Sequence, residues 1–307
     1  MLILKFCPKL LPPITSEVRG FPADRETSCS VRRVEAFGLL GDWRAANVAI
    51  GVLSTSADAD HIQTHGSVDR LFELASVTKP LSALAILVAV EEGILTLDEP
   101  VGPPGTTVRH LLSHAGGLAP DQRRLLTEAG TRRIYSNAGY ELVADLVATR
   151  AEMPFAEYFR EALVEPLGLR HTTLSGSPAH GAVSSVRDLM VVLSELLASD
   201  PEVVARETRM QATSAAFPEL AGVLPGFGSQ DPNPWGLGFE IRGRKSPHWT
   251  GSQNAPNTFG HFGKAGTFIW VDPTAGVACV ALTDRTFGPW AAREWPVFSD
   301  AVLRQAG

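Results

Sequence analysis

The sequence predicts an α+β fold in which helices flank one antiparallel sheet and an all-helical lobe is inserted into the chain. Two observations predict this architecture. Strand-like patterns gather near both ends of the chain, whereas helical patterns fill the middle. We therefore expect an α/β lobe that combines residues 34–100 and 228–307, and a helical lobe of residues 101–227 between them. A cleft between two such lobes is the default place for an active site.

The expected strands are short apolar runs bounded by turn residues. The first run, ANVAIGVL at residues 46–53, is nearly continuous in apolar side chains, and a polar turn leads from it to a second strand at 61–65. These two strands resemble an opening hairpin. The later strands are expected at residues 235–241, 266–271 and 277–282.

The helices begin with residues 77–92, which are apolar on nearly every side and therefore predict a helix at the centre of the structure. The longest apolar run, residues 81–90, is about half of what a bilayer crossing needs, so we expect a soluble protein. Further helical patterns, separated by Gly, Pro and Ser, lie at residues 108–113, 138–151, 155–164, 186–197, 202–211 and 290–305.

Composition and charge exclude several functions. The formal net charge of −6 comes from scattered residues, and without a basic run we expect neither nucleic acid nor a membrane as partner. Residues 1–33 contain prolines and arginines without periodicity, which predicts a poorly ordered extension, and they hold no signal-peptide core, so a cytoplasmic location is expected. Cys7, Cys29 and Cys279 form no CxxC pair, and we expect no cysteine chemistry.

The first candidate catalytic motif is Ser-Val-Thr-Lys at residues 76–79. A serine hydroxyl needs a base to take its proton, and a lysine three positions along a helix lies one turn away on the same face. Pro80 indicates the register, because proline is tolerated only in the first turn of a helix. Ser76 is therefore expected at the helix start, where the helix dipole stabilises a developing oxyanion and disfavours a protonated Lys79.

The motif makes a demand on Lys79. To act as a base near neutrality, this lysine must have a pKa lowered by about three units, roughly 4 kcal/mol, which burial and nearby positive charge can supply. The alternative interpretation is that Ser76 caps the helix and Lys79 is a surface charge, although the helix dipole disfavours a lysine there.

Two further motifs follow in order, Tyr-Ser-Asn at residues 135–137 and His-Phe-Gly at 261–263. Together the three motifs resemble those of class C β-lactamases, D,D-peptidases and related esterases. Other stretches are similar to the same family, and the resemblance covers roughly residues 35–300. It implies a β-lactamase/transpeptidase-like fold. These other stretches are residues 108–118, 165–169, 183–189 and 235–239.

The resemblance implies a role for each residue of the second and third motifs. Tyr135 would relay the proton between Ser76 and the leaving group, and would later activate the deacylating water. Asn137 would donate a hydrogen bond to the carbonyl on the acyl side of the substrate and contact the lysine. His261 stands where class C β-lactamases carry lysine and many esterases and peptidases carry histidine, and Gly263 keeps that strand free of bulk beside the substrate.

The neighbours of the third motif bear on the substrate. The resemblance implies an oxyanion hole formed by the backbone N–H groups of Ser76 and Lys264. Phe262 stands where a Thr or Ser often helps to bind a carboxylate, so that contact is lost in this chain. The Lys264 side chain would either bind an acidic substrate tail or face solvent at the strand edge.

We expect no metal and no organic cofactor. His110 and His114 are spaced i, i+4, but no glutamate lies between them and no third ligand stands out, so a zinc site lacks support. The resemblance implies a structural role for this stretch. Residues 260–264 are too short for a phosphate-binding loop, and neither a Gly-x-Ser-x-Gly elbow nor a dinucleotide-binding unit is present.

The predicted function is hydrolysis of an ester or small amide through an acyl-enzyme on Ser76, with Lys79 and Tyr135 transferring protons. One alternative is a D-amino-acid-specific peptidase, either a D,D-carboxypeptidase or a D-aminopeptidase, or a weak β-lactamase. Another is a penicillin-recognising binding module without turnover. A scaffold that has lost catalysis and serves only for interaction is disfavoured, because only a shared chemistry links Ser76, Lys79, Tyr135 and Asn137. The expected partner is a small ester, amide or D-peptide, and the sequence does not predict an oligomeric state.

Overall fold

The computed structural model describes residues 35–55 and 60–306. The extension expected at residues 1–33, with Cys7 and Cys29, lies outside these ranges. Cys279 lies within them and is buried in a central strand. No helix of the described ranges is long and apolar enough to cross a membrane.

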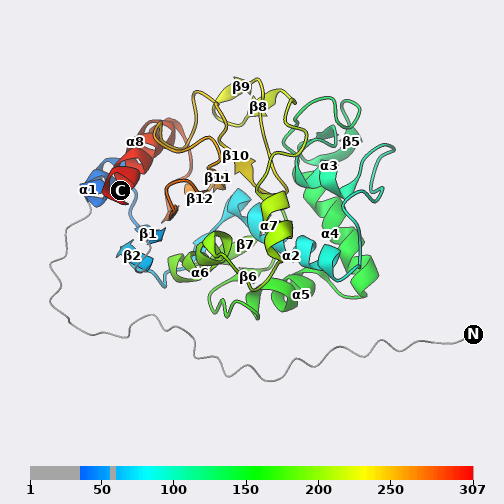
Figure 1. Ribbon diagram of the computed structural model, residues 1–307, viewed down its shortest axis with the longest axis horizontal. Coiled ribbons are helices and arrows are strands. Elements are labelled where there is room, and N and C mark those ends of the chain that lie inside the picture. Colours follow the sequence, from blue (N-terminus) through cyan, green and yellow to red (C-terminus); the bar gives the residue numbers. More distant parts are fainter. Residues whose placement is uncertain (1–34, 56–59, 307) are drawn as a thin grey trace, which may run out of the picture. The chain divides into compact units, whose positions relative to one another are not determined.

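A six-stranded antiparallel sheet joins the two ends of the chain (Figure 1). Its strand order is β10-β11-β12-β13-β1-β2, and the pairing of β1 with β13 places Val48 opposite Thr283 and Ser54 opposite Val277. The prediction of one antiparallel sheet built from both chain ends is confirmed. The strands are β1 (Val48–Thr55), β2 (Asp60–His65), β10 (Glu240–Ile241), β11 (Phe259–Gly263), β12 (Thr267–Asp272) and β13 (Val277–Thr283).

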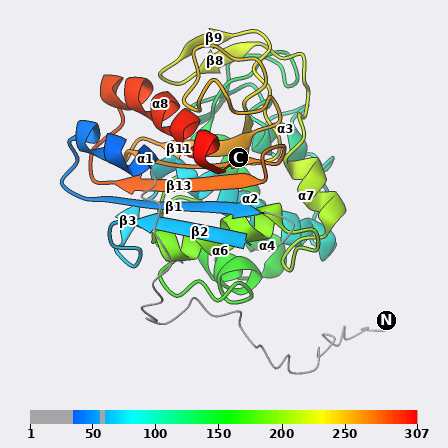
Figure 2. The same ribbon diagram turned by 60° about the vertical axis from the view of Figure 1, so that its left-hand side comes forward.

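Side chains of the sheet alternate between two apolar cores, one on each face, as the twofold period of a strand requires. In β12, Phe268 and Trp270 belong to an aromatic core with α8 (Pro289–Ala306). Ile269 and Val271 belong to the larger core on the other face. Figure 2 shows α8 and α6 on opposite sides of β13 and β1.

The helices of the aromatic face come from both chain ends. The short α1 (Glu35–Gly38) and the 3₁₀ turn η1 (Leu39–Trp43) pack against α8. The larger core contains α2 (Thr78–Glu91), whose side chains are buried on nearly every side, as predicted for residues 77–92. The other helices are α3 (Val108–Leu112), α4 (Asn137–Ala151), α5 (Phe155–Phe159), the π-helical turn η3 (Arg160–Val164), α6 (Val186–Leu197) and α7 (Arg206–Ala212).

Short strands lie before, between and after the helices α3 to α7, and the sequence analysis did not predict them. Strands of two to four residues are too short for an alternating pattern to show. They form a three-stranded sheet, β3 (Phe72–Glu73), β7 (Ala182–Ser184) and β6 (Thr173–Leu174), and two hairpins, β4–β5 (Leu118–Ala119 and Gln122–Leu125) and β8–β9 (Gly222–Leu224 and Gly228–Gln230).

The strand expected at residues 235–241 is shorter than predicted. Only Glu240 and Ile241 join the six-stranded sheet, while Trp235 pairs through isolated bridges. Gly238 has a φ of +95° and packs so closely on Ala83 of α2 that a β-carbon would not fit. This left-handed glycine, just before β10, interrupts the expected strand and lets the segment pass close to the central helix.

Candidate active site

Ser76 lies in a tight 3₁₀ turn, η2 (Ala75–Val77), that connects β3 directly to α2. It is half-buried. The preceding Ala75 has a φ of +47°, which is uncommon for a residue with a β-carbon. Such strained conformations concentrate at functional sites, and here the turn places the serine at the start of the central helix. The predicted position of Ser76 is confirmed.

Lys79 is fully buried in the first turn of α2, and its Nζ meets oxygen atoms on three sides. It donates to Asn137 Oδ1 at 2.6 Å and to the Ala179 carbonyl at 2.9 Å, and lies 3.4 Å from Ser76 Oγ. A neutral amine has two N–H bonds and one lone pair. The two short contacts account for both N–H bonds, which leaves the lone pair for the serine hydroxyl.

Burial favours the neutral form of Lys79. Desolvation holds the pKa of Lys79 well below that of an ordinary lysine, and the carboxylates of Asp121 and Glu141 oppose this shift only in part. The interpretation of Lys79 as a surface charge is therefore wrong. Burial thus lowers the pKa of Lys79 in the direction that a base requires, whereas nearby positive charge, the other expected cause, does not contribute.

Tyr135 lies over Lys79. The Lys79 Nζ is 4.6 Å from the centre of the Tyr135 ring, and the Tyr135 hydroxyl is buried and has no hydrogen-bond partner in the described part of the chain. Burial raises the pKa of Tyr135, which keeps the phenol protonated at ordinary pH. The nearby Ser76 side chain acts in the opposite direction, but the two hydroxyls do not reach the geometry of a full hydrogen bond. Tyr135 thus holds an available donor beside the serine.

Asn137 connects Lys79 to a carboxylate. It begins α4, where Ser136 caps the helix by accepting from the Gly139 N–H. Its Oδ1 accepts from Lys79, and its Nδ2 donates to Asp121 Oδ1 at 2.7 Å. One Nδ2 hydrogen remains for a substrate carbonyl. The predicted contact between Asn137 and the lysine is confirmed, whereas its contact with a substrate stays a prediction.

His261 lies on β11 and is buried beside Tyr135, with the two ring centres 5.8 Å apart. Its Nδ1 is 2.7 Å from the Phe262 carbonyl, an acceptor, so the proton belongs on Nδ1. Nε2 is then a buried acceptor without a partner among the described residues. Burial and the nearby Lys79 lower the pKa of His261 to about 3. The imidazole is therefore neutral.

Phe262 and Gly263 have opposite surroundings, as neighbours in a strand should. Phe262 packs in an aromatic cluster with Phe227, Trp249 and Phe287, so the position offers a phenyl ring and no hydroxyl. Gly263 lies against the turn that holds Ser76: a β-carbon there would overlap the Leu74 carbonyl. Gly263 thus lets β11 approach this turn closely, whereas its expected role in leaving room beside the substrate stays a prediction.

Lys264 follows β11 directly. Its side chain is exposed, and it makes no hydrogen bond to the motif residues in the described ranges. Its carbonyl accepts from the Phe287 N–H at 2.9 Å, which ties the end of β11 to the loop after β13. The N–H groups of Ser76 and Lys264 therefore belong to two segments that Gly263 holds together, and their role as oxyanion donors stays a prediction.

Several groups of the site were missed by the sequence analysis. Asp121, in the β4–β5 turn, and Glu141, on α4, act on Lys79 by their charges. Trp235 packs edge-on against His261 with ring centres 5.4 Å apart. The Trp-Gly-Leu-Gly stretch had signalled Trp235 only as part of the family resemblance. The contact of the Ala179 carbonyl could not be predicted from the sequence, because every residue has a backbone carbonyl.

His114 is also part of the site. Its ring packs on Tyr135 with ring centres 4.4 Å apart. His110 lies apart from it, stacked on Phe217 at 4.5 Å with its Nδ1 near Thr107 Oγ1. Among the described residues, no group of three or more His, Cys, Asp or Glu side chains could hold a metal ion.

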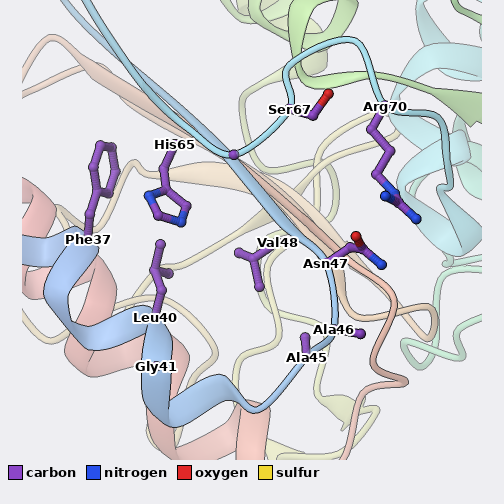
Figure 3. A pocket seen from close by; sticks show the side chains of 11 residues that line it. Phe37, Leu40, Gly41, Ala45, Ala46, Asn47, Val48, His65, Ser67 and Arg70 are labelled. Carbon is purple, nitrogen blue, oxygen red and sulfur yellow. The ribbon is translucent and has the colours of Figure 1, made fainter.

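A cavity of about 420 Å³ lies elsewhere, between η1, the start of β1 and the end of β2. Figure 3 shows Phe37 and His65 at one end of it and Asn47 and Arg70 at the other. Asn47 is already bound to Asp284. The cavity shares no residue with the three motifs, so the chemistry of this chain is assigned to the site around Lys79.

The comparisons with known proteins agree with this geometry. The family model named Beta-lactamase matches residues 41–303. The crystal structure of a β-lactamase from Mycobacterium bovis is 50% identical and superposes with a TM-score of 0.84, covering 88% of this chain and 99% of that chain. The predicted resemblance and the predicted β-lactamase/transpeptidase-like fold are confirmed.

Curated relatives match over shorter stretches. Penicillin-binding protein 4* of Bacillus subtilis is 30% identical over an alignment of 135 residues, and the match covers 33% of this chain and 30% of the relative. A D-alanyl-D-alanine-carboxypeptidase/endopeptidase of Escherichia coli is 24% identical over an alignment of 148 residues, and the match covers 36% of this chain and 38% of the relative. The matches span about a third of the length of these relatives.

Proposed function

This chain is a serine hydrolase of the β-lactamase family, and from that premise we propose that it cleaves an ester or a small amide through an acyl-enzyme on Ser76. The observation that carries the proposal is the environment of Lys79. Its amine is buried, Asn137 Oδ1 and the Ala179 carbonyl accept from it, and Ser76 Oγ lies 3.4 Å away, where the lone pair of the neutral amine would be free to take the serine proton. This is the arrangement that a serine nucleophile needs for activation.

In the first half of the reaction, Ser76 Oγ attacks the substrate carbonyl while its proton passes to Lys79 Nζ. The carbonyl oxygen gains negative charge, which the backbone N–H groups of Ser76 and Lys264 would stabilise. The intermediate then collapses: the bond to the leaving group breaks, and the leaving group takes the proton from Lys79 by way of Tyr135. The acyl group remains as an ester on Ser76.

In the second half, water replaces the leaving group. Lys79, neutral again, takes a proton from the water through Tyr135, and the hydroxide formed attacks the acyl ester. The raised pKa of Tyr135 indicates that its phenol is protonated between steps, so it passes a proton on rather than resting as a phenolate. Collapse of this second intermediate returns the proton to Ser76 and releases the acid.

The surroundings of the site favour an uncharged substrate. His261 is neutral, and the neighbouring Phe262 carries no hydroxyl, so the pair that holds a carboxylate in β-lactam and D,D-peptide recognition is absent. Asp121 and Glu141 add negative charge near Lys79. A carboxylate on the substrate would meet repulsion there, and the cation adjacent to the third motif is the exposed Lys264.

A second candidate function is hydrolysis of D-amino-acid peptides or weak hydrolysis of β-lactams. The observation that favours it is the 50% identity to the β-lactamase of Mycobacterium bovis, together with the shorter matches to a penicillin-binding protein and a carboxypeptidase. A binding module that is acylated without turnover is the third candidate. It would release one equivalent of leaving group and then stop.

The test is release of nitrophenolate from p-nitrophenyl acetate and butyrate, followed together with intact mass. The wild-type chain should turn over, and Ser76→Ala and Lys79→Ala should each lose activity by at least about a thousandfold. Ser67→Ala, at an exposed position on the far cavity, is the matched control and should behave as wild type. Nitrocefin and a D-alanyl-D-alanine peptide in the same assay distinguish the second candidate.

Each outcome decides between the candidates. Steady turnover that depends on Ser76 and Lys79 supports the hydrolase. A single burst with a stable mass increase on wild type supports the binding module. Equal activity in the wild type and the Ser76→Ala variant refutes the catalytic assignment.

A further inference from the structure

His114 holds the backbone on both sides of Tyr135. The His114 carbonyl accepts from the Ile134 N–H at 2.9 Å, and His114 Nδ1 accepts from the Ser136 N–H at 3.1 Å. One residue thus binds the amides that precede and follow Tyr135. The backbone of the second motif is fixed at two points by hydrogen bonds of ordinary length.

The His114 ring also packs against the Tyr135 ring. The ring centres are 4.4 Å apart, and Trp235 closes the other side of the imidazole edge-on at 4.6 Å. Tyr140 lies 5.5 Å away. His114 is itself almost completely buried, so its ring has little room to move.

From these contacts we propose that His114 is a positioning residue, which holds the Tyr135 hydroxyl beside Ser76 and Lys79 by binding the flanking amides and packing on the ring. This inference rests on the proposed function of Tyr135 in proton transfer. The Tyr135 hydroxyl has no hydrogen-bond partner of its own among the described residues, so nothing at its polar end fixes its place. The constraint must come from the backbone and the ring. Trp235 and His261 also pack on the ring, each at 5.8 Å, but His114 packs on it at 4.4 Å and binds the flanking amides as well.

The chemistry of the position suits histidine in its neutral form. Nδ1 must lack a proton to accept from the Ser136 N–H, so the proton lies on Nε2. Burial, with Lys79, His261 and Arg133 nearby, lowers the pKa of His114 and keeps the ring neutral, while the Ser136 N–H bond selects the tautomer. The backbone φ of His114 is +59°, which histidine and asparagine tolerate better than most residues.

The test is a double-mutant cycle between His114 and Tyr135. His114→Asn keeps an acceptor and tolerates the backbone conformation but removes the ring. We expect it to lower kcat on p-nitrophenyl butyrate by about ten- to a hundredfold with KM within about twofold. A small displacement of a catalytic group strongly slows the chemical step. In a Tyr135→Phe background the same change should cost less than about twofold, since the hydroxyl it positions is gone.

His110→Asn is the matched control. It removes a histidine of the same segment that does not touch Tyr135, and it should leave kcat and KM unchanged. His114→Phe restores a ring but not the acceptor, and should recover only part of the loss if both contacts matter. Thermal unfolding of every variant identifies those that fail to fold, and the cycle is interpreted from the folded ones.

A second measurement does not depend on activity. The chain contains three tyrosines, so ¹³Cζ-tyrosine NMR gives three signals, and Tyr135→Phe assigns one of them. His114→Asn should shift the Tyr135 signal and, less strongly, that of Tyr140, while Tyr158 serves as the internal reference. His110→Asn should shift none of the three.

The outcomes are separable. An equal fold loss from His114→Asn in both backgrounds would show general structural damage and overturn the positioning role. An unshifted Tyr135 signal in folded His114→Asn would also overturn it. If Tyr135→Phe alone keeps full activity, the proposed proton transfer by Tyr135 fails, and the NMR signal then decides whether His114 still orders that ring.

Discussion

Asn137 Oδ1 accepts a hydrogen bond from Lys79 Nζ at 2.6 Å, and this bond joins the first turns of two helices that are 58 positions apart in the chain. The same asparagine donates to Asp121 at 2.7 Å. A buried amine is thus linked to an exposed carboxylate through one amide. This link connects the proton affinity of Lys79 to the charge of Asp121.

Lys79 should control the acid side of the pH profile. The neutral amine is the active form, and its fraction grows as pH rises through the lysine pKa. Because burial lowers that pKa, kcat/KM should fall only at a pH well below the ordinary value of 10.5. Lys79→Arg places a permanent cation at this position that cannot lose its proton, so it should be at least about a thousandfold less active. A pH–rate profile with an acid limb near 10, or an active Lys79→Arg, would contradict the proposed base.

Asp121→Asn should shift the same acid limb to lower pH. The Asp121 carboxylate raises the pKa of Lys79, so its removal lowers that pKa further and the neutral amine persists in more acidic solution. For an exposed carboxylate in water we expect a shift of a few tenths of a pH unit, up to about 0.7. Asp145→Asn is the control, because Asp145 pairs with Arg123 on the surface. A shift toward higher pH in Asp121→Asn would reverse the assigned sign.

Gly263→Ala should damage the site more than the fold. The new methyl group would overlap the Leu74 carbonyl and lie 3.2 Å from the Ala75 β-carbon, so β11 and the Ser76 turn must move apart. We expect a loss of about 1–3 kcal/mol in the free energy of unfolding and at least about a tenfold loss in kcat/KM. Gly41→Ala, where a β-carbon meets nothing within 4 Å, is the control. Urea unfolding and esterase assays on both variants make the comparison.

The catalytic motifs could be predicted because their residues are joined by short spacings. Ser76 and Lys79 are one helical turn apart, and Pro80 indicates where that turn lies. Tyr135 and Asn137 flank the cap of α4, a sequence signal in its own right. For the same reason several longer strands and helices could be predicted: local period and turn residues determine them, as in β13 and α6.

The supporting residues could not be predicted, because long-range packing decides their contacts. His114 stood out only as half of an unsupported zinc pair with His110, and its contact with Tyr135 depends on how two distant loops meet. Asp121 lies in the turn of the β4–β5 hairpin, where it accepts from Asn137. The strands of this hairpin are too short to show a sequence pattern. Ala75, with its positive φ, gave no signal either, since alanine rarely adopts that conformation.

A buried ion cluster near Trp235 and His261 was also not predicted from the sequence. Glu240, on β10, accepts from Lys245 and Trp249, and its Oε1 lies 2.8 Å from His248 Nε2. Burial alone would raise the pKa of Glu240, but the charges and hydrogen bonds of Lys245 and His248 outweigh it and hold that pKa well below its usual range. All four side chains of the cluster are buried.

Glu240→Gln should therefore destabilise the protein strongly. It leaves the buried Lys245 without its carboxylate, and breaking such a pair on one side costs about 3–5 kcal/mol in the free energy of unfolding. Glu240→Gln combined with Lys245→Met should recover most of that loss, because both charges are then gone. The exposed Glu165→Gln change, in a surface pair with Arg160, should cost less than about 1 kcal/mol.

The pH dependence of this effect has a definite sign. Because the pKa of Glu240 is lowered in the folded state, its stabilisation is complete above the pKa of an unfolded glutamate, about 4.3, and declines as pH falls toward the lowered value. The stability gap between wild type and Glu240→Gln should thus be constant from pH 6 to 8 and narrow below about pH 4. Urea midpoints across this range measure it. A gap that widens in acid would show that Glu240 is protonated in the folded protein and that Lys245 is held by its amide and carbonyl contacts alone.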